Sequence, residues 1–396
     1  MLAGMRPLDG ITVVSLEQAV AAPFATRQLA DLGARVIKIE RPGSGDFARH
    51  YDTTVKGLCS YFVWLNRSKE SLTLDVKAPQ GRQVLDELLA AADVFVQNLG
   101  PGAARRLGLD AATLTRRYPG LITCAVSGYG SDGPWAGRKA YDLLVQCETG
   151  LVSLTGTPEH VAKVGISVAD IAAGMYAYSG ILTALYQRAT AQTVQPVEVA
   201  LFDALAEWMG QPAYYTRYGG SAPKRVGAQH ATIAPYGPFR TAAGDIVLLS
   251  IQNEREWRSL CADVLQRPEV ATDASFATGD ARVENRDELN ELITKRFETL
   301  ATEDVVHLLD AAGIANARLN SMTEFLAHPV LAERERWRTV DTPAGPIAAL
   351  SPPATMPGVE PRMDPVPAIG EHTEAILREL GRTDDQIRSL REAGVV

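Results

Sequence analysis

Short apolar runs alternate with amphipathic stretches along the first 130 residues of the chain. The runs of strand length are 11–16, 35–40, 72–76, 93–97 and 121–126. The intervening stretches 23–32 and 79–92 place apolar residues at helical spacing. A strand, a helix and a second strand in this order form a βαβ unit, whose strands are parallel. The alternation therefore predicts an α/β domain with a mainly parallel sheet covered by helices.

The pattern changes in the middle of the chain. Glycine, serine, proline and basic residues gather between 218 and 228, and strand and helix patterns resume after them. A proline-rich stretch, 343–367, precedes a final helical pattern. We expect three parts: a large domain over 1–215, a smaller α+β domain over 225–330, and a linker with a C-terminal return to the large domain over 331–396.

Composition excludes several classes of function. The 396 residues carry a net charge of −8, and a general nucleic-acid-binding protein needs a basic surface instead. The apolar stretch 174–186 is too short to span a bilayer, and no export signal is recognisable, so we expect a cytoplasmic protein without membrane contact. The four cysteines are scattered without a CxxC pair, which fits a reducing compartment and predicts no metal site.

The turn after the first strand argues against a dinucleotide enzyme. Residues 17–23 read EQAVAAP, without a glycine where the GxGxxG fingerprint would lie. The chain also lacks the P-loop, HExxH and GxSxG patterns. Nicotinamide, P-loop, metalloprotease and serine-hydrolase chemistry therefore lose their usual support.

Asp170 stands between a short apolar run and a long helical pattern that reaches about Thr190. We expect it at the N-cap of that helix, where a carboxylate accepts backbone N–H bonds. Ala172, Ala173 and Gly174 leave space around it. From the residues alone, Asp170 is either an ordinary cap or a carboxylate exposed to a ligand at a helix N-terminus.

Basic residues recur where the predicted strands end and in the loops that follow. They are Lys38, Arg41, Lys77, Arg105, Arg106, Arg138 and Lys139. Ligands of open α/β sheets bind outside the carboxyl ends of the strands, so these cations could hold a polyanion such as a nucleotide's phosphates. The alternative is that they are solvated surface charges.

Several motifs, taken in order, resemble those of the family III CoA-transferases. They are LDGI (8–11), LGARVIKIERPGSGD (32–46), NRSK (66–69), LDVK (74–77), NLGPG (98–102), SGYG (127–130), the Asp170 segment and GEHT (370–373). The resemblance implies a Rossmann-like large domain, a smaller α+β domain and an interlaced homodimer. It also implies that Asp170 is a catalytic nucleophile, and that CoA is a substrate with no cofactor tightly bound.

The same resemblance assigns CoA contacts to individual residues. It places Ala19, Val20 and Ala21 along the pantetheine arm, and Asn98 and Leu99 along the cofactor backbone. It places Arg41 at the adenine, Leu74 and Lys77 at the nucleotide end, and Arg106 and Lys139 at the phosphates. Val20 departs from family members that carry glutamine there. The expected partners are acyl-CoA, a carboxylic acid and a second copy of the chain.

The α-methylacyl-CoA racemases share the fold and are the alternative function. They need a second acid or base, a histidine in a Gly-His-Asp motif, and this chain has Tyr141 in its place, before Asp142. The segment 227–257 resembles the transferase branch acting on dicarboxylates such as succinyl-CoA or mesaconyl-CoA. His230, Tyr236 and Arg255 are then candidates to bind the distal carboxylate, or are structural. The acids that give and accept CoA stay open.

Overall fold

The chain forms two compact units in a computed structural model that describes residues 5–396. The larger unit comprises Met1–Thr149, Gly165–Met209 and Ala332–Val396, and the smaller comprises Gly150–Val164 and Gly210–Leu331. The segment Gly150–Val164 therefore belongs to the smaller unit, although we expected it in the large domain. The Arg225 guanidinium shows why, because it donates hydrogen bonds to the carbonyls of Ser153, Thr157 and Pro158.

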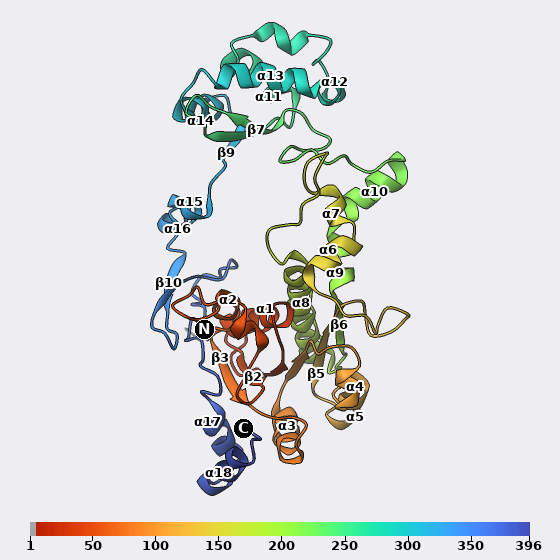
Figure 1. The fold of residues 1–396 in the computed structure, drawn as a ribbon, viewed down its shortest axis with the longest axis vertical. Coiled ribbons are helices and arrows are strands. Elements are labelled where there is room, and N and C mark those ends of the chain that lie inside the picture. Colours follow the sequence, from red (N-terminus) through yellow and green to blue (C-terminus); the bar gives the residue numbers. More distant parts are fainter. Residues whose placement is uncertain (1–4) are drawn as a thin grey trace. The chain divides into compact units, whose positions relative to one another are not determined.

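A six-stranded sheet organises the larger unit (Figure 1). Its strands are β1 (Thr12–Leu16), β2 (Arg35–Glu40), β3 (Lys69–Thr73), β4 (Val94–Gln97), β5 (Ile122–Ser127) and β6 (Val197–Ala200). They lie in the order β3-β2-β1-β4-β5-β6, and every neighbouring pair is parallel. This is the strand order of a Rossmann fold, so the predicted parallel α/β sheet is confirmed.

Helices and short turns cover the sheet and connect its strands. They are α1 (Ala21–Asp31), η1 (Phe47–His50), α2 (Ser60–Leu65), α3 (Pro79–Ala91), α4 (Ala103–Arg106), α5 (Ala111–Arg117), α6 (Asp142–Glu148), α8 (Val168–Ala191), α9 (Leu201–Trp208), α17 (Thr373–Glu379) and α18 (Asp384–Glu392). A hairpin of β10 (Trp337–Val340) and β11 (Ile347–Leu350) completes the unit.

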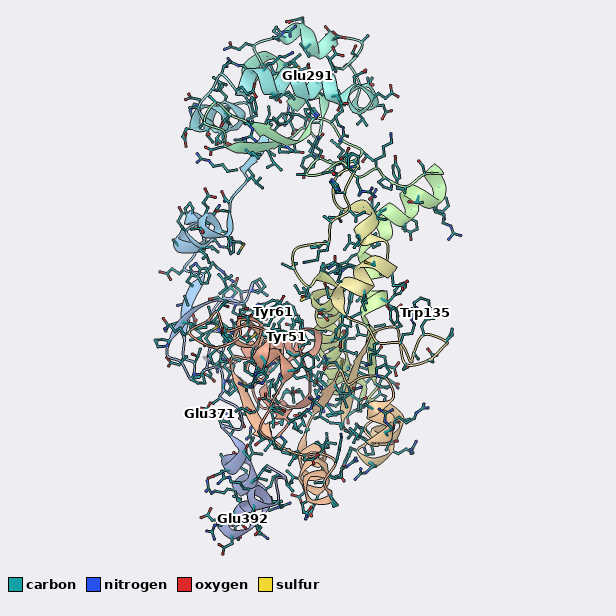
Figure 2. The ribbon with its side chains drawn as sticks, viewed as in Figure 1. Tyr51, Tyr61, Trp135, Glu291, Glu371 and Glu392 are labelled. Carbon is teal, nitrogen blue, oxygen red and sulfur yellow. The ribbon has the colours of Figure 1, made fainter. Side chains whose placement is uncertain are left out.

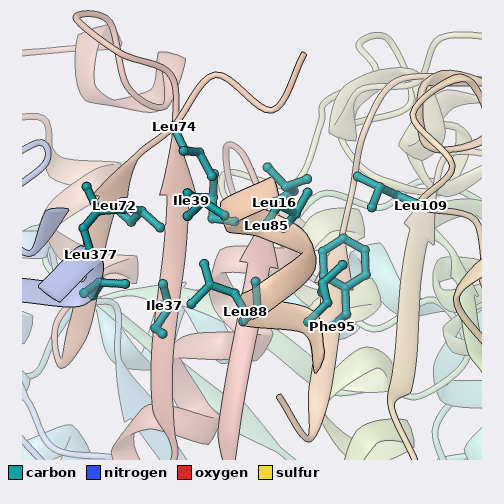
Figure 3. Close-up of a cluster of buried hydrophobic side chains, with 14 of the residues drawn as sticks. Leu16, Ile37, Ile39, Leu72, Leu74, Leu85, Leu88, Phe95, Leu109 and Leu377 are labelled. Atoms are coloured by element: carbon teal, nitrogen blue, oxygen red, sulfur yellow. The ribbon is translucent and has the colours of Figure 1, made fainter. Parts of the chain in front are cut away.

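One face of the sheet packs against α3, α5, α17 and α18 in a single hydrophobic core. Figure 3 shows Leu85 and Leu88 of α3 beside Ile37 of β2 and Phe95 of β4. Because side chains alternate along a strand, the buried residues Val13 and Val36 point to the opposite face, where α1 contacts β2. The sheet is thus buried on both sides, as parallel sheets are.

The long helix α8 packs closely against α1. Gly174 permits this approach, because a Cβ atom there would lie 2.7 Å from the carbonyl oxygen of Ala21 and 3.0 Å from Cδ1 of Phe24. By length and hydropathy alone α8 also qualifies as a membrane-spanning helix, which we did not expect from the sequence. Its contacts with α1, β5, β6 and α9 explain that composition, since a core helix of a globular domain is apolar as well.

The smaller unit is a mixed α+β structure. Its antiparallel sheet has the order β7-β8-β9, formed by β7 (Tyr236–Arg240), β8 (Ile246–Ser250) and β9 (Ala315–Arg318). The helical segments are α7 (Leu151–Leu154), α10 (Gly210–Gly219), α11 (Glu254–Ser259), η2 (Leu260–Val264), η3 (Pro268–Thr272), α12 (Gly279–Glu284), α13 (Arg286–Phe297), α14 (Thr302–Ala311), α15 (Met322–Leu326) and α16 (Pro329–Glu333). Its core surrounds Trp257, Phe239 and Phe297.

Two element boundaries differ from the sequence prediction. The third strand spans Lys69–Thr73 rather than 72–76, because Lys69 and Ser71 pair with β2 and turn their polar side chains into the protein. Helix α8 begins at Val168 with Ser167 as its N-cap. The prediction that Asp170 is the N-cap was therefore wrong, since this residue lies in the first turn of the helix.

Candidate active site

A cavity of about 550 Å³ opens at the carboxyl ends of β1, β2, β3 and β4. This is where the strand order reverses between β1 and β4, the position at which open α/β sheets bind ligands. Four of the predicted CoA contacts line the cavity: Arg41, Leu74, Lys77 and Leu99. Arg41 and Lys77 are exposed, so their charges can meet an anionic ligand.

The turn after β1 forms one wall of this cavity. Asn98 holds the turn in place, because its Oδ1 accepts the N–H of Gln18 and its Nδ2 donates to the Gln18 carbonyl, both at 2.8 Å. Asn98 thus shapes the wall rather than lining the space. Ala19 has a φ of +60°, a conformation that costs a residue other than glycine about 1 kcal/mol. Its N–H donates to Oδ1 of Asp46, which secures the turn.

A cluster of buried charges lies beneath the turn. Lys38 Nζ lies 2.7 Å from Asp46 and 3.6 Å from Glu17, and Lys69 Nζ lies 2.7 Å from Glu17. The four side chains are buried. Burial works to raise the pKa of Glu17, but the ammonium groups of Lys69 and Lys38 outweigh it and hold that pKa below its usual value. Lys38 is therefore internal, so both alternatives, a cation facing a polyanion and a solvated surface charge, are wrong for this residue.

A third carboxylate, Glu40, extends this cluster to the loop after β2. Glu40 accepts hydrogen bonds from Arg49, from Ser71 Oγ and from the N–H of Asp46. Burial works to raise the pKa of Glu40, but the bond from Arg49 and the charge of Lys38 lower it to about 2. The loop that carries Arg41 and Asp46 is therefore held by ionised groups on both sides.

Asp170 lies partly buried in the first turn of α8. Within residues 5–396 its carboxylate makes no hydrogen bond and no ion pair. Burial raises the pKa of Asp170 to about 7, and the negative charge of Asp142 adds to the rise. An aspartate in water has an ordinary pKa near 3.9. Desolvation therefore brings the ionisation of Asp170 close to neutral pH.

Tyr51 connects Asp170 with the wall of the cavity. Burial raises its pKa to about 12, and the charges of Asp46 and Asp170 both contribute, so its hydroxyl lies in the field of each carboxylate. Its ring centroid is 5.8 Å from that of Tyr61 and 5.6 Å from that of Phe47. Figure 2 labels Tyr51 and Tyr61 next to each other. Both tyrosines are partly exposed. We missed them in the sequence, where a tyrosine in a loop carries no motif of its own.

The remaining predicted CoA contacts lie outside the cavity lining. Val20 and Ala21 begin α1 with their side chains buried, so only their backbone could meet a ligand. Ala19 is partly exposed. Arg106 at the end of α4 and Lys139 in the loop before α6 are exposed, and neither makes an ion pair in the described part of the chain. In that part no group of His, Cys, Asp and Glu side chains could hold a metal ion.

Two of the three predicted substrate residues of the smaller unit lie together. The rings of His230 and Tyr236 stack at 5.2 Å with an interplanar angle of 10°, and the N–H of His230 donates to the Tyr236 carbonyl. Arg255 is exposed in the first turn of α11, and its guanidinium makes no hydrogen bond or ion pair to a described residue. A structural role for Arg255 through an ion pair therefore has no support among the described residues.

Comparison with known proteins decides the family. The model of CoA-transferase family III matches residues 8–373. The chain belongs to CoA-transferase family III. It is an enzyme that transfers CoA, as its relatives' names state.

Relatives and a solved structure cover nearly the whole chain. Human succinyl-CoA:glutarate CoA-transferase is 33% identical over 99% of this chain and 90% of its own length. Acetyl-CoA:oxalate CoA-transferase of Acetobacter aceti is 33% identical over 90% of this chain and 93% of its own. The crystal structure of a CAIB/BAIF family protein from Brucella suis has a TM-score of 0.83 and 33% identity, covering 95% of this chain and 99% of its own.

The buried lysine predicts a large loss of stability on substitution. Lys38→Met should lower the free energy of unfolding by about 3–5 kcal/mol, because the substitution leaves Asp46 and Glu17 with less compensation in the interior. Urea unfolding followed by circular dichroism measures the loss. The control is Lys295→Met, which removes an exposed i,i+4 pair with Glu291 and should cost less than about 0.5 kcal/mol. Equal losses would contradict the structural role of the cluster.

The raised pKa of Asp170 predicts a pH-dependent effect on stability. A proton binds more tightly to Asp170 in the folded protein, with a pKa of about 7 against an ordinary 3.8, so this contribution to stability is complete below pH 4 and lost as pH rises through 7. Asp170→Asn should therefore stabilise the protein by about 1–3 kcal/mol at pH 8 and by almost nothing at pH 4. Urea unfolding across this range measures it. Asp203→Asn, in the exposed first turn of α9, should show no such trend.

Proposed function

We propose that the enzyme moves CoA from succinyl-CoA, or a related dicarboxyl-CoA, to a carboxylic acid through covalent intermediates on Asp170. The observation that carries this proposal is the state of the Asp170 carboxylate, which is desolvated and free of hydrogen bonds in the described structure. A carboxylate without donors keeps its lone pairs available for attack, whereas a capped carboxylate is stabilised as a resting anion.

The reaction divides CoA exchange into steps on one side chain. An oxygen of Asp170 attacks the carbonyl carbon of the donor thioester, the carbon–sulfur bond breaks, and CoA leaves as thiolate, so that a mixed anhydride remains. The thiolate then attacks the Asp170 carbonyl of the anhydride, which releases the donor acid and leaves an aspartyl-CoA thioester. The acceptor carboxylate attacks this thioester, and the two steps run in reverse to give the new acyl-CoA and free Asp170.

The start of α8 supplies the electrostatic support that these steps need. Each attack places negative charge on a carbonyl oxygen next to Asp170, and the positive end of the helix dipole favours such charge. The N–H groups of Val168 and Ala169 already donate to Ile166 and Asp142, whereas the N–H of Asp170 has no acceptor in the described residues. That N–H is therefore available to the oxyanion.

The cavity at the strand ends is the proposed site for the nucleotide end of CoA. It offers the exposed cations Arg41 and Lys77 beside the apolar side chains Leu74 and Leu99, a combination suited to phosphates and an adenine ring. Tyr51 lies in the field of both Asp46, which lines this cavity, and Asp170. The pantetheine arm would then extend past Ala19 toward the nucleophile. Arg106 and Lys139 would meet phosphates outside the cavity.

A dicarboxylate substrate is supported by the names of relatives and by the smaller unit. The human relative is named for succinyl-CoA and glutarate, and the Acetobacter relative for acetyl-CoA and oxalate, so each name contains at least one dicarboxylate. A distal carboxylate needs a cation or polar donors, and the unpaired Arg255 and the stacked His230 and Tyr236 are the proposed ones. A panel of acceptor acids against succinyl-CoA and acetyl-CoA would identify the pair that the enzyme uses.

A covalent adduct on Asp170 tests the mechanism. The enzyme incubated with succinyl-CoA and then quenched with hydroxylamine should yield a hydroxamate on the peptide that carries Asp170, detected by mass spectrometry, because anhydrides and thioesters both react with this nucleophile. Asp170→Ala should lose the adduct and at least about 10⁴-fold of the transfer rate. The matched control Asp203→Ala should retain both.

Two outcomes would remove this proposal. Transfer retained by Asp170→Ala would exclude the nucleophile. Exchange of the α-hydrogen of a 2-methylacyl-CoA for deuterium in D₂O at turnover rates, without CoA transfer, would favour the racemase instead. The racemase reaction needs a second acid or base, and the position of the racemase histidine is occupied here by Tyr141, an exposed residue just before α6.

We also propose that two copies of the chain form a homodimer, as expected from the family resemblance. Support comes from helices that bury no side chain within one chain, namely α10, α15 and α16. Tyr214 and Tyr218 on α10 are 67% and 78% exposed, and Met322 on α15 is 72% exposed. Short helices with apolar surface are marginal in water unless they pack against a partner.

Sedimentation velocity tests the dimer. The enzyme should sediment as a dimer at micromolar concentration, and replacing Tyr214 and Tyr218 together with glutamate should shift it toward the monomer while far-ultraviolet circular dichroism is unchanged. The control replaces the exposed residues Lys295 and Glu291 of α13 with glutamate and lysine. A monomeric wild-type protein would contradict the proposal.

A further inference from the structure

Asp142 joins the helix that carries the nucleophile to the neighbouring helix α6. It is the first residue of α6 and is partly buried. Its Oδ1 accepts the N–H of Ala169 at 2.8 Å, and its Oδ2 accepts a hydrogen bond from Nε2 of Gln146 at 2.7 Å. Both oxygens are thus held in place, one by the first turn of α8 and the other by α6 itself.

The bond to Ala169 removes a donor from the surroundings of Asp170. The N–H groups of a helix's first turn are the natural partners of a carboxylate at that end, and such bonds lower a carboxyl pKa. The N–H of Ala169 belongs to this turn, one residue before Asp170, and it is occupied by Asp142. Asp170 is left without a hydrogen bond in the described part of the chain.

The charge of Asp142 acts on Asp170 as well. Among residues 5–396, Asp142 from α6 and the hydroxyl of Tyr51 from the loop after η1 interact electrostatically with Asp170, and the tyrosine is uncharged at neutral pH. No lysine, arginine or histidine among residues 5–396 forms an ion pair with Asp170. Two carboxylates that share a site without a cation disfavour each other's ionised form, typically by one pKa unit or more.

We propose that Asp142 is a positioning residue for CoA transfer, because it anchors the start of α8 and keeps the anionic form of Asp170 unstabilised until a thioester is attacked. When the Asp170 oxygen bonds to the acyl carbon and the carbon–sulfur bond breaks, the negative charge moves from Asp170 to the departing CoA thiolate. The repulsion between the two carboxylates is then relieved, so the covalent intermediate is favoured over the resting enzyme. This inference rests on the nucleophilic role proposed above.

Three variants separate the charge of Asp142 from its hydrogen bond. Asp142→Asn keeps an amide oxygen for the N–H of Ala169 and removes the charge, whereas Asp142→Ala removes both. Asp203→Asn removes one negative charge from the first turn of α9 and is the matched control. Should Asp142→Asn fail to fold, Asp142→Ser removes the same charge with a smaller side chain that can still accept a hydrogen bond.

The first measurement needs no substrate. The stabilisation caused by Asp170→Asn is followed against pH in the wild-type and Asp142→Asn backgrounds. It rises between the pKa of the unfolded chain and that of the folded protein, and the upper pH at which its slope has fallen by half, called the midpoint here, reports the ionisation of Asp170 in the folded protein. We expect the midpoint to lie near pH 7 in the wild type and to fall by about one pH unit or more when the charge of Asp142 is removed. In the Asp203→Asn background the midpoint should remain near pH 7. An unshifted midpoint would overturn the inference.

The second measurement follows the rate of Asp170 acylation by succinyl-CoA against pH. In Asp142→Asn the pH below which the acylation rate declines should fall together with the midpoint. The plateau of the acylation rate above pH 8 should fall about tenfold, since one pKa unit corresponds to a factor of ten in an equilibrium constant. Asp142→Ala should lose more, because α8 also loses its anchor. A plateau equal to that of the wild type would overturn the inference. A shifted midpoint in an enzyme that never becomes acylated would instead overturn the proposed function.

Discussion

The buried ion cluster beneath the turn after β1 is the interaction on which the rest of the larger unit depends. Glu17, Lys38, Lys69 and Asp46 are removed from water, and each ion is compensated by at least one opposite charge. Such clusters are costly to assemble but penalise any arrangement that breaks them, because a single unpaired ion in the interior costs several kcal/mol. The cluster therefore specifies one conformation of the surrounding loops.

That conformation positions the turn after β1 and the loop after β2, which lie on either side of the cavity in the proposed site. Asp46 accepts the N–H of Ala19 and so retains the left-handed turn after β1, while Glu40 and Arg49 hold the loop that carries Arg41. The cavity occupies the space between this loop and the turn. In many Rossmann folds glycines allow the turn to approach a pyrophosphate. Here alanine and a buried carboxylate produce the tight turn, and the missing fingerprint is therefore compatible with the Rossmann strand order.

Asp170 follows a different electrostatic rule from the cluster. Glu17 and Glu40 are buried with cations, which keep them ionised, whereas in the described part of the chain the carboxylate of Asp142 and a tyrosine hydroxyl act on Asp170 and no cation pairs with it. The pKa values of these carboxyls are consequently far apart, a separation typical of sites that assign different roles to chemically similar groups. Glu17 and Glu40 are structural ions, and Asp170 is the carboxylate proposed to change its covalent state.

Local patterns in the sequence determined the parallel α/β sheet, the identity of Asp170 as the residue of interest and, through the family resemblance, CoA transfer. These follow from apolar periodicity and ordered motifs, both of which are properties of short segments. Only the tertiary structure decided that α8 begins before Asp170, that Lys38 is internal and that Gly150–Val164 belongs to the smaller unit. It also decided that Tyr51 lies in the electrostatic field of Asp170. The cytoplasmic location stays a prediction. The physical reason for the difference is that burial, pKa and pairing depend on side chains brought together from distant segments, as Glu17, Lys69 and Asp142 are, and no local pattern encodes those contacts.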